Sequence, residues 1–190
     1  MLIESARISK YIFSVLFFSS FLLAQNNNSY TAKEISRDSL LMVSHAIIES
    51  AGCRVLITVD ENGKPHAREM DAFTPREDMV IWLGTNPKTR KVKQIENNPN
   101  VVVFYYDTKG VSYVSIEGKA RLINDSILKA KYWKDNWNRF YPDRDKDFIL
   151  IQVTPVRLEL VSYKYNLFNL TTDTFMPLSV EFETSKTKGN

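Results

Sequence analysis

The chain has 190 residues, of which 44% are hydrophobic and 25% are charged, a composition typical of one globular domain with a short extension. The formal charge is +3 with no block of like charges, which argues against the basic arm of a nucleic-acid-binding protein, so we expect no nucleic-acid partner. Because the chain has one cysteine, Cys53, it cannot form an internal disulfide, and its stability must come from packing or association.

The N-terminus has the layout of a secretory signal peptide. Arg7 and Lys10 make a basic start, an apolar run of 14 residues from Tyr11 to Ala24 follows, and polar residues come next. A bilayer-spanning helix needs about 20 apolar residues, so an uncleaved anchor is the less favoured alternative. We therefore predict a signal peptide over 1–24 that meets the membrane only transiently, followed by an exported domain, periplasmic or secreted, over 25–183 and a polar tail over 184–190.

The first predicted elements are a helix and a hairpin. Apolar residues at helical spacing after the capping box Thr31–Glu34 predict a helix from about Thr31 to Ser50, ended by Gly52. Two strands, 54–59 and 65–73, are joined by a turn at Asp60–Gly63.

A third strand and a short helix complete the first half. The strand is expected over 79–83, and the helix over 89–97 ends before Pro99, because proline disfavours a helical conformation in the preceding residue. An apolar strand over 101–106 follows.

The second half is dominated by strands. A long strand over 111–123 carries Gly118, where we expect a bulge or a close backbone approach. A helix capped at Asn124–Ser126 is predicted to run to about Asn138, with Trp133 and Trp137 on one face as core or interface anchors. Two further strands, 148–153 and 156–163, are separated by Pro155, and nothing divides the chain, so one mixed α+β barrel is expected.

The segment Gly84–Lys91 has the pattern of a phosphate site. Thr85 and Thr89 precede a helix that opens on Arg90 and Lys91, so hydroxyls, free backbone N–H groups and cations come together. Arg68, on the strand before, can grip a phosphate with two parallel hydrogen bonds. The alternative interpretation is that Arg90, Lys91 and Lys93 form only the solvated face of a short helix.

Other chemistry has weaker support. His66 shares a strand face with Arg68, and it either acts near a substrate or has no role beyond the strand. His45 lies among apolar helix positions and is interpreted as a structural residue. With these two histidines and Cys53 far apart in sequence, neither a metal site nor a cysteine nucleophile is supported. Neither a P-loop nor a Gly-rich dinucleotide loop occurs.

The order of elements resembles the pyridoxamine 5′-phosphate oxidase-like superfamily of FMN-binding split barrels. The resemblance rests on His66–Met70, Thr85–Lys91, Gln94–Pro99 and Ile116–Ala120, and covers roughly Ser39 to Ser162. The later pattern of Asp125, Trp133, Trp137 and Phe140–Pro142 is similar to the general stress protein-like branch. The implied fold class is α+β, an antiparallel, Greek-key-like split β-barrel with a few flanking helices.

The resemblance also implies a site and an assembly. It places FMN phosphate contacts at Arg68, Thr89, Arg90 and Lys91, strand-end flavin contacts at Gly84 and Thr85, and Tyr113 beside the ring. Tyr113 stands where related oxidases commonly have an amide side chain, so stacking on the ring replaces a hydrogen bond. The family implies a homodimer with the cofactor at the interface.

Two functions remain open. The first is an exported FMN-dependent oxidoreductase acting on an unknown small molecule, and not a true pyridoxamine phosphate oxidase, because the substrate-holding Arg/His pattern of that enzyme has no match after Pro155. The second is a non-catalytic carrier or sensor dimer that holds flavin, haem or another flavin-like cofactor. A cofactor-free interaction dimer is a weaker third reading, and the fold alone does not choose among them.

Overall fold

The computed structural model describes residues 35–168 and 176–183. The chain divides into two units, Met1–Glu34 and Ile35–Asn190, and everything described belongs to the second. The predicted signal peptide over 1–24, the capping box at Thr31–Glu34 and the polar tail over 184–190 lie outside the described residues.

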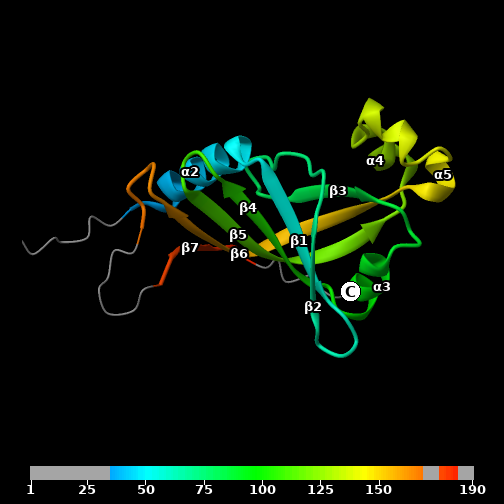
Figure 1. Cartoon of the computed structure of the whole chain (residues 1–190), viewed down its shortest axis with the longest axis horizontal. Coiled ribbons are helices and arrows are strands. Elements are labelled where there is room, and N and C mark those ends of the chain that lie inside the picture. Colours follow the sequence, from blue (N-terminus) through cyan, green and yellow to red (C-terminus); the bar gives the residue numbers. More distant parts are fainter. Residues whose placement is uncertain (1–34, 169–175, 184–190) are drawn as a thin grey trace, which may run out of the picture. The chain divides into compact units, whose positions relative to one another are not determined.

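One antiparallel sheet organises the described part of the chain (Figure 1). Its hydrogen-bonded order is β2-β1-β4-β5-β6-β3, and β7 pairs with the second half of β6. Among the described residues the path does not close, which makes this an open, split barrel and confirms the predicted α+β class. The strands are β1 Cys53–Val59, β2 Pro65–Glu69, β3 Ile81–Thr85, β4 Asn100–Asp107, β5 Ser112–Ile123, β6 Ile149–Ser162 and β7 Leu178–Glu181.

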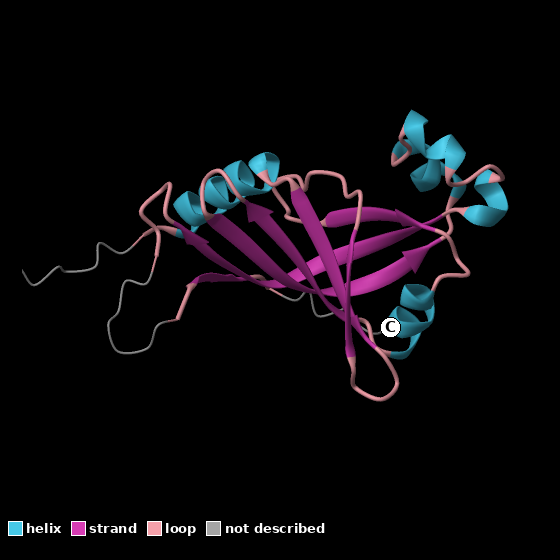
Figure 2. Ribbon diagram, viewed as in Figure 1, coloured by secondary structure: helices cyan, strands magenta, loops and turns pink. Residues whose placement is uncertain are grey.

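The helices flank this sheet (Figure 2). The long helix α2 contacts β4, β5 and β7, and the short helix α3 contacts β1 and β5. No helix within residues 35–168 and 176–183 is both long and apolar enough to span a bilayer. The helical segments are α2 Arg37–Ser50, α3 Arg90–Asn97, α4 Ser126–Lys131, the 3₁₀ helix η2 Asp135–Arg139 and α5 Arg144–Asp147.

Helix α2 begins later than the sequence predicted. Ser36 is its N-cap, with extended backbone angles, and its hydroxyl accepts the backbone N–H of Ser39 at 3.3 Å. An N-cap residue lies outside the helix by definition, so the continuous helix from Thr31 was wrong.

The core lies between the sheet and α2. Along β4, Val103 and Tyr105 are buried while Val102 and Phe104 are half-exposed, because successive strand side chains point to opposite faces. The buried face of the sheet packs under the apolar side of α2. The core includes Leu40 and Ile47 of α2 and, from the sheet, Leu56, Val103, Ile116, Leu158 and Leu160.

Gly118 marks a bulge that lets β6 pass through a proline. The β5–β6 register shifts between Glu117 and Gly118, as the sequence predicted, and Gly118 pairs with Pro155. The predicted break at Pro155 was wrong, because β6 runs unbroken from Ile149 to Ser162. A bulge disrupts the hydrogen-bond ladder locally, so the absence of a backbone N–H at proline is tolerated there.

The predicted helix over 124–138 is also wrong. Helix α4 ends at Lys131, and the chain resumes as the 3₁₀ helix η2, so Trp133 and Trp137 do not share a helix face. Trp137 is nevertheless buried, and it forms a second, smaller core with Phe148 and Leu150, which confirms its role as an anchor.

Replacing Gly118 by Ala should destabilise the fold by about 1–3 kcal/mol, the usual cost of overpacking. A Cβ at this position would lie 2.6 Å from the carbonyl oxygen of Thr154, and this backbone oxygen has little freedom to move. Urea unfolding measures the effect. Gly52→Ala is the matched control, since a Cβ there meets nothing within 4 Å. Equal unfolding midpoints for the two variants would contradict the packing explanation.

Candidate functional site

The predicted phosphate motif lies where β3 ends and α3 begins (Figure 1). Gly84 and Thr85 are the last residues of β3, Thr89 is the N-cap of α3, and Arg90 and Lys91 form its first turn. Because β3 ends the strand path, its polar turn is available to a ligand rather than to another strand.

A cleft of 680 Å³ opens beside this junction, within the range of about 300–1,000 Å³ common for ligand sites. Three parts of the chain line it: the end of β2, the β3–α3 junction, and the segment around η2. The lining residues are Glu69, Met70, Asp71, Gly84, Thr85, Asn86, Thr89, Lys91, Asn136, Trp137, Arg139, Phe140 and Tyr141.

Two hydroxyls and one ammonium group meet on the α3 side of the cleft. Lys91 Nζ donates to Thr85 Oγ1 at 3.1 Å, and this oxygen lies 3.2 Å from Thr89 Oγ1. The Thr89 hydroxyl donates to the carbonyl of Asn86 at 2.9 Å, and no described side chain caps α3. The first N–H groups of α3 therefore lack a side-chain acceptor, as at helix ends that bind anions.

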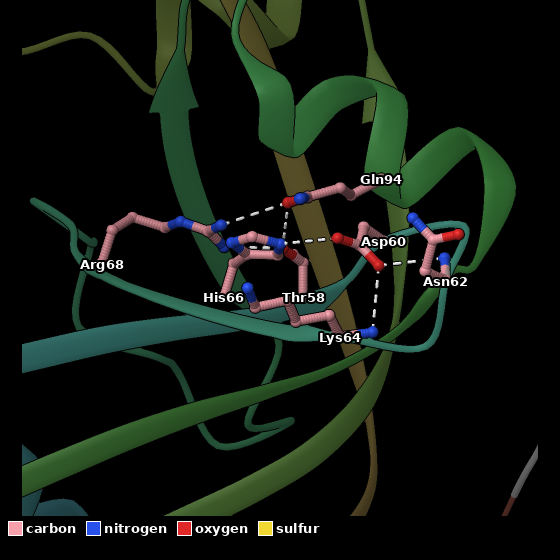
Figure 3. Close-up of polar contacts among 7 residues, drawn as sticks. All are labelled: Thr58, Asp60, Asn62, Lys64, His66, Arg68 and Gln94. Carbon is pink, nitrogen blue, oxygen red and sulfur yellow. Dashed lines mark hydrogen bonds and ion pairs between the residues drawn. The ribbon is translucent and has the colours of Figure 1, made fainter.

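Arg68 is held by buried polar groups from two other elements (Figure 3). Its guanidinium donates to Thr58 Oγ1 on β1 at 2.7 Å and to Gln94 Oε1 on α3 at 3.1 Å. The Thr58 hydroxyl also donates to Gln94 Oε1, at 2.6 Å, and both Thr58 and Gln94 are buried. This network links β2, β1 and α3, so the position of Arg68 is set before any ligand arrives.

The cations of this site lack an acidic partner within residues 35–168 and 176–183. Among the described residues, no carboxylate lies within ion-pair distance of Arg68, Arg90 or Lys91. Burial, and then the charge of Arg68, lowers the pKa of Lys91; burial, and then the charge of Arg90, lowers the pKa of Arg68. Each charged form is thus disfavoured, and a bound anion would relieve that cost.

Arg90 faces away from the cleft, into a separate cavity. This cavity of 250 Å³ is lined by Asp60, Glu61, His66, Arg90, Lys93 and Gln94. His66 Nε2 lies 2.9 Å from Asp60 Oδ2, and that hydrogen bond is the main cause of the lowered pKa of Asp60 (Figure 3). The structure therefore brings Gly84, Thr85, Thr89 and Lys91 together on the cleft, whereas neither Arg68 nor Arg90 lines it.

Tyr113 lies far from the cleft within one chain. It pairs with Tyr106 near the start of β5 and stacks on Phe104 with 5.4 Å between ring centroids. The part of β5 beside α3 is Ala120, whose backbone N–H donates to the carbonyl of Pro99, just beyond that helix. Ala120 is seven residues from Tyr113 along the strand, or about 24 Å at ~3.4 Å per residue. A flavin role for Tyr113 stays a prediction, and it requires a second copy of the chain.

Sequence reasoning missed several residues that shape the site. Asp71 accepts the indole N–H of Trp137 at 2.8 Å, which fixes η2 to the end of β2. A Cβ on Gly84 would lie 2.5 Å from the Trp137 ring, so the glycine is needed for this close packing. Thr58 and Asp71 carried no sequence signal, and Gln94 was part of the family resemblance with no role assigned, because their partners are 10 to 66 residues away along the chain.

The chain is similar to one protein family and to one characterised relative. The family model described as pyridoxamine 5′-phosphate oxidase matches residues 42–162. General stress protein 26 of Bacillus subtilis (strain 168) is 33% identical over 106 residues, which cover 54% of this chain and 74% of that protein.

Two solved structures extend the comparison. The general stress protein 26 of Bacillus anthracis strain Sterne is 34% identical, with a TM-score of 0.55 over 64% of this chain and 93% of that chain. A pyridoxamine 5′-phosphate oxidase-related, FMN binding protein of Nostoc punctiforme PCC 73102 is 16% identical, with a TM-score of 0.56 over 80% of this chain and 99% of that chain. The second likeness shows the fold alone.

Replacing Lys91 by Met should make the ligand-free protein more stable at neutral pH, because it removes a partly buried cation close to Arg68. The folded-state pKa of Lys91 lies below its ordinary value of 10.5, so the unfolded chain binds the proton more tightly. The free energy of unfolding of the wild-type protein should therefore rise as the pH approaches 10.5, and the difference in stability between Lys91→Met and wild type should shrink. Urea unfolding between neutral pH and that value measures both effects.

The control for this experiment is Lys88→Met, an exposed lysine of the same turn that lines neither cavity. It should leave stability unchanged across the same pH range. A Lys91→Met protein less stable than wild type would mean that Lys91 serves the fold and not a ligand.

Proposed function

The chain belongs to the pyridoxamine 5′-phosphate oxidase family, and from this premise we propose that it binds FMN in the cleft beside α3. One observation carries the proposal: Lys91 and Arg68 are partly buried cations with no carboxylate partner among the described residues. A dianionic phosphate supplies the missing negative charge. The FMN binding relative from Nostoc punctiforme has the same fold, which agrees with the proposal.

The residues on the cleft suit both parts of the cofactor. The phosphate would be held by the Thr85 and Thr89 hydroxyls, Lys91 and the free N–H groups of α3. Arg68 and Arg90 would add positive charge from outside the cleft lining. The remaining length of the cleft has apolar and aromatic walls that include Met70, Trp137 and Tyr141, suited to a flat ring. When bound, FMN supplies hydride or electron transfer, while the protein orients it and sets access.

We propose an oxidoreductase of unknown small-molecule substrate rather than a pyridoxamine phosphate oxidase. Arg157 is the one arginine after Pro155, and no histidine occurs there. Its guanidinium bonds Glu159 at 2.8 Å and Glu181 at 2.9 Å, so it is occupied within its own sheet. A non-catalytic flavin carrier or sensor with the same pocket is the alternative, and reduction of the bound flavin by NAD(P)H with transfer to an acceptor separates the two.

We also propose that the chain forms a homodimer through the outer face of the sheet. Val55 pairs with Phe104, and Ile57 pairs with Val102, which gives an apolar, half-exposed surface across β1 and β4. A groove of 330 Å³ continues this surface toward Gly118 and Val156. Tyr113 lies on the same face, so pairing of two copies is the arrangement in which it approaches a partner's cleft.

Export is a further proposal, supported by the charged, apolar and polar order of residues 1–28. An exported protein would acquire its flavin outside the cytosol or carry it across the membrane. Cell fractionation of the full chain, with the N-terminal sequence of the mature protein determined, tests the proposal.

Replacing both Arg68 and Lys91 by Ala should raise the dissociation constant for FMN at least tenfold. Charge-assisted hydrogen bonds contribute about 1.5–3 kcal/mol each, and about 1.4 kcal/mol corresponds to a factor of ten. Quenching of flavin fluorescence during titration of the purified mature protein measures the affinity. A Soret band in the protein as purified would identify haem as the ligand instead.

Two further proteins make this experiment decisive. Lys91→Ala alone leaves the network of Arg68, Thr58 and Gln94 intact, and it should weaken FMN binding in the same direction. The control variant replaces Lys88 and Lys146, which do not line the cleft, by Ala, and it should bind FMN as wild type does. Unchanged titration curves for the Arg68 and Lys91 double variant would refute the proposed phosphate site.

Phe104→Glu should convert the dimer into a monomer, because it places a charge in the centre of the apolar outer face. Size-exclusion chromatography with light scattering measures the mass. The control is Ile127→Glu, at a position that is 76% exposed on α4. A wild-type chain that is monomeric at micromolar concentration, or a dimer that survives Phe104→Glu, would exclude this interface.

A further inference from the structure

The wall of the cleft opposite α3 has no part in holding the phosphate. It is made by Asn136, Arg139, Phe140 and Tyr141, in and just after η2. Phe140 is 57% exposed although it lines a concave surface. An exposed aromatic ring inside a cleft is a feature of ligand sites, where large apolar groups remain uncovered until the ligand binds.

Arg139 supplies a positive charge beside this ring. Its guanidinium carbon lies 4.5 Å from the centroid of the Phe140 ring, a cation–π distance. Among the described residues, no carboxylate forms an ion pair with it. A stacked guanidinium keeps its N–H donors directed outward along its edge, which suits a planar anionic group such as a carboxylate or sulfonate.

The wall stands on a fixed base. Trp137 donates its indole N–H to Asp71 Oδ2 at 2.8 Å, and Lys134 Nζ donates to the carbonyl of Ala72 at 3.1 Å. The backbone N–H groups of Phe140 and Tyr141 both bond the carbonyl of Trp137, at 2.9 and 3.0 Å. Because Trp137 is itself buried, Arg139 and Phe140 project from an anchored turn.

The remaining charges in the cleft indicate where an anion can lie. Glu69 and Asp71 line the end nearest β2. Asp71 forms an ion pair with Lys134, whereas Glu69 is exposed and has no ion-pair partner among the described residues. A second anion is therefore disfavoured beside Glu69 and favoured beside Arg139, across the cleft from Lys91.

We propose that Arg139 and Phe140 form the recognition site for the substrate, and that the substrate is a planar aromatic anion. The ring of this ligand packs on Phe140 and its negative substituent pairs with Arg139. The inference rests on the proposed function, in which FMN places its phosphate on the α3 side and its ring against Met70, Trp137 and Tyr141, and so leaves Arg139 and Phe140 for a second molecule.

Naphthalene-2-sulfonate and its neutral sulfonamide are matched probes for this site. Isothermal titration calorimetry with the FMN-saturated protein should show tighter binding of the sulfonate. Arg139→Gln should weaken sulfonate binding about tenfold or more, the loss expected for a charge-assisted bond, and leave sulfonamide binding unchanged. Phe140→Ala should weaken the binding of both probes, because both stack on the ring.

Lys146→Gln is the control, since this exposed lysine lies outside the cleft and should leave the binding of both probes unchanged. Undetectable binding of the sulfonate at millimolar concentration, equal affinity for the two probes, or an Arg139→Gln protein that binds the sulfonate as wild type does would each overturn the inference. FMN affinity is measured for every variant, and Arg139→Gln should not change it. If the wild-type protein does not bind FMN but the FMN-free protein still binds the sulfonate more tightly than the sulfonamide, the proposed function is refuted and the recognition site at Arg139 and Phe140 is supported.

Discussion

Within the part of the chain that the structure describes, two partly buried cations without a carboxylate beside them are the constraint on which the cleft depends. Arg68 and Lys91 come from different elements, are partly buried, and each lies in an environment that lowers its pKa. The lowered pKa values mean that burying these two charges costs stability in the ligand-free protein. Arg68 is kept in place by Thr58 and Gln94, buried polar groups whose hydrogen bonds would be lost if Arg68 moved, and Lys91 by its hydrogen bond to Thr85. On the proposed function, the fold gives up some stability to keep a site for an anion, as functional sites commonly do.

The two walls of the cleft are joined by packing rather than by chain continuity. Gly84 and Trp137 lie 53 positions apart in the sequence, yet a Cβ on the glycine would lie 2.5 Å from the indole ring. Asp71 then fixes that indole from the end of β2. Because these contacts hold η2 against β3, the threonine and lysine side and the aromatic side face each other across a space that can take a flat ligand.

Alternation and turn chemistry were sufficient to predict β1 to β6 near their observed positions, although β2 ends at Glu69 rather than Phe73, and β7 was not predicted. The bulge at Gly118 was also predicted, since glycine inside a strand pattern commonly marks one. The errors have physical causes. Pro155 sits at that bulge, so β6 continues through it. The helix expected over 124–138 ends at Lys131, because contacts of Lys134 and Trp137 with Asp71 outweigh local helix propensity.

The sequence alone determined the fold class and the phosphate motif, because both depend on short-range order: side-chain period, turn residues, and hydroxyls and cations next to a helix start. It could not show that Arg90 lies outside the cleft, that Gln94 and Thr58 hold Arg68, or that η2 forms one wall of the cleft. Those features are contacts between residues far apart along the chain. Such contacts exist only after the strands have paired and packed, since no local pattern specifies which distant side chain will fill a given space.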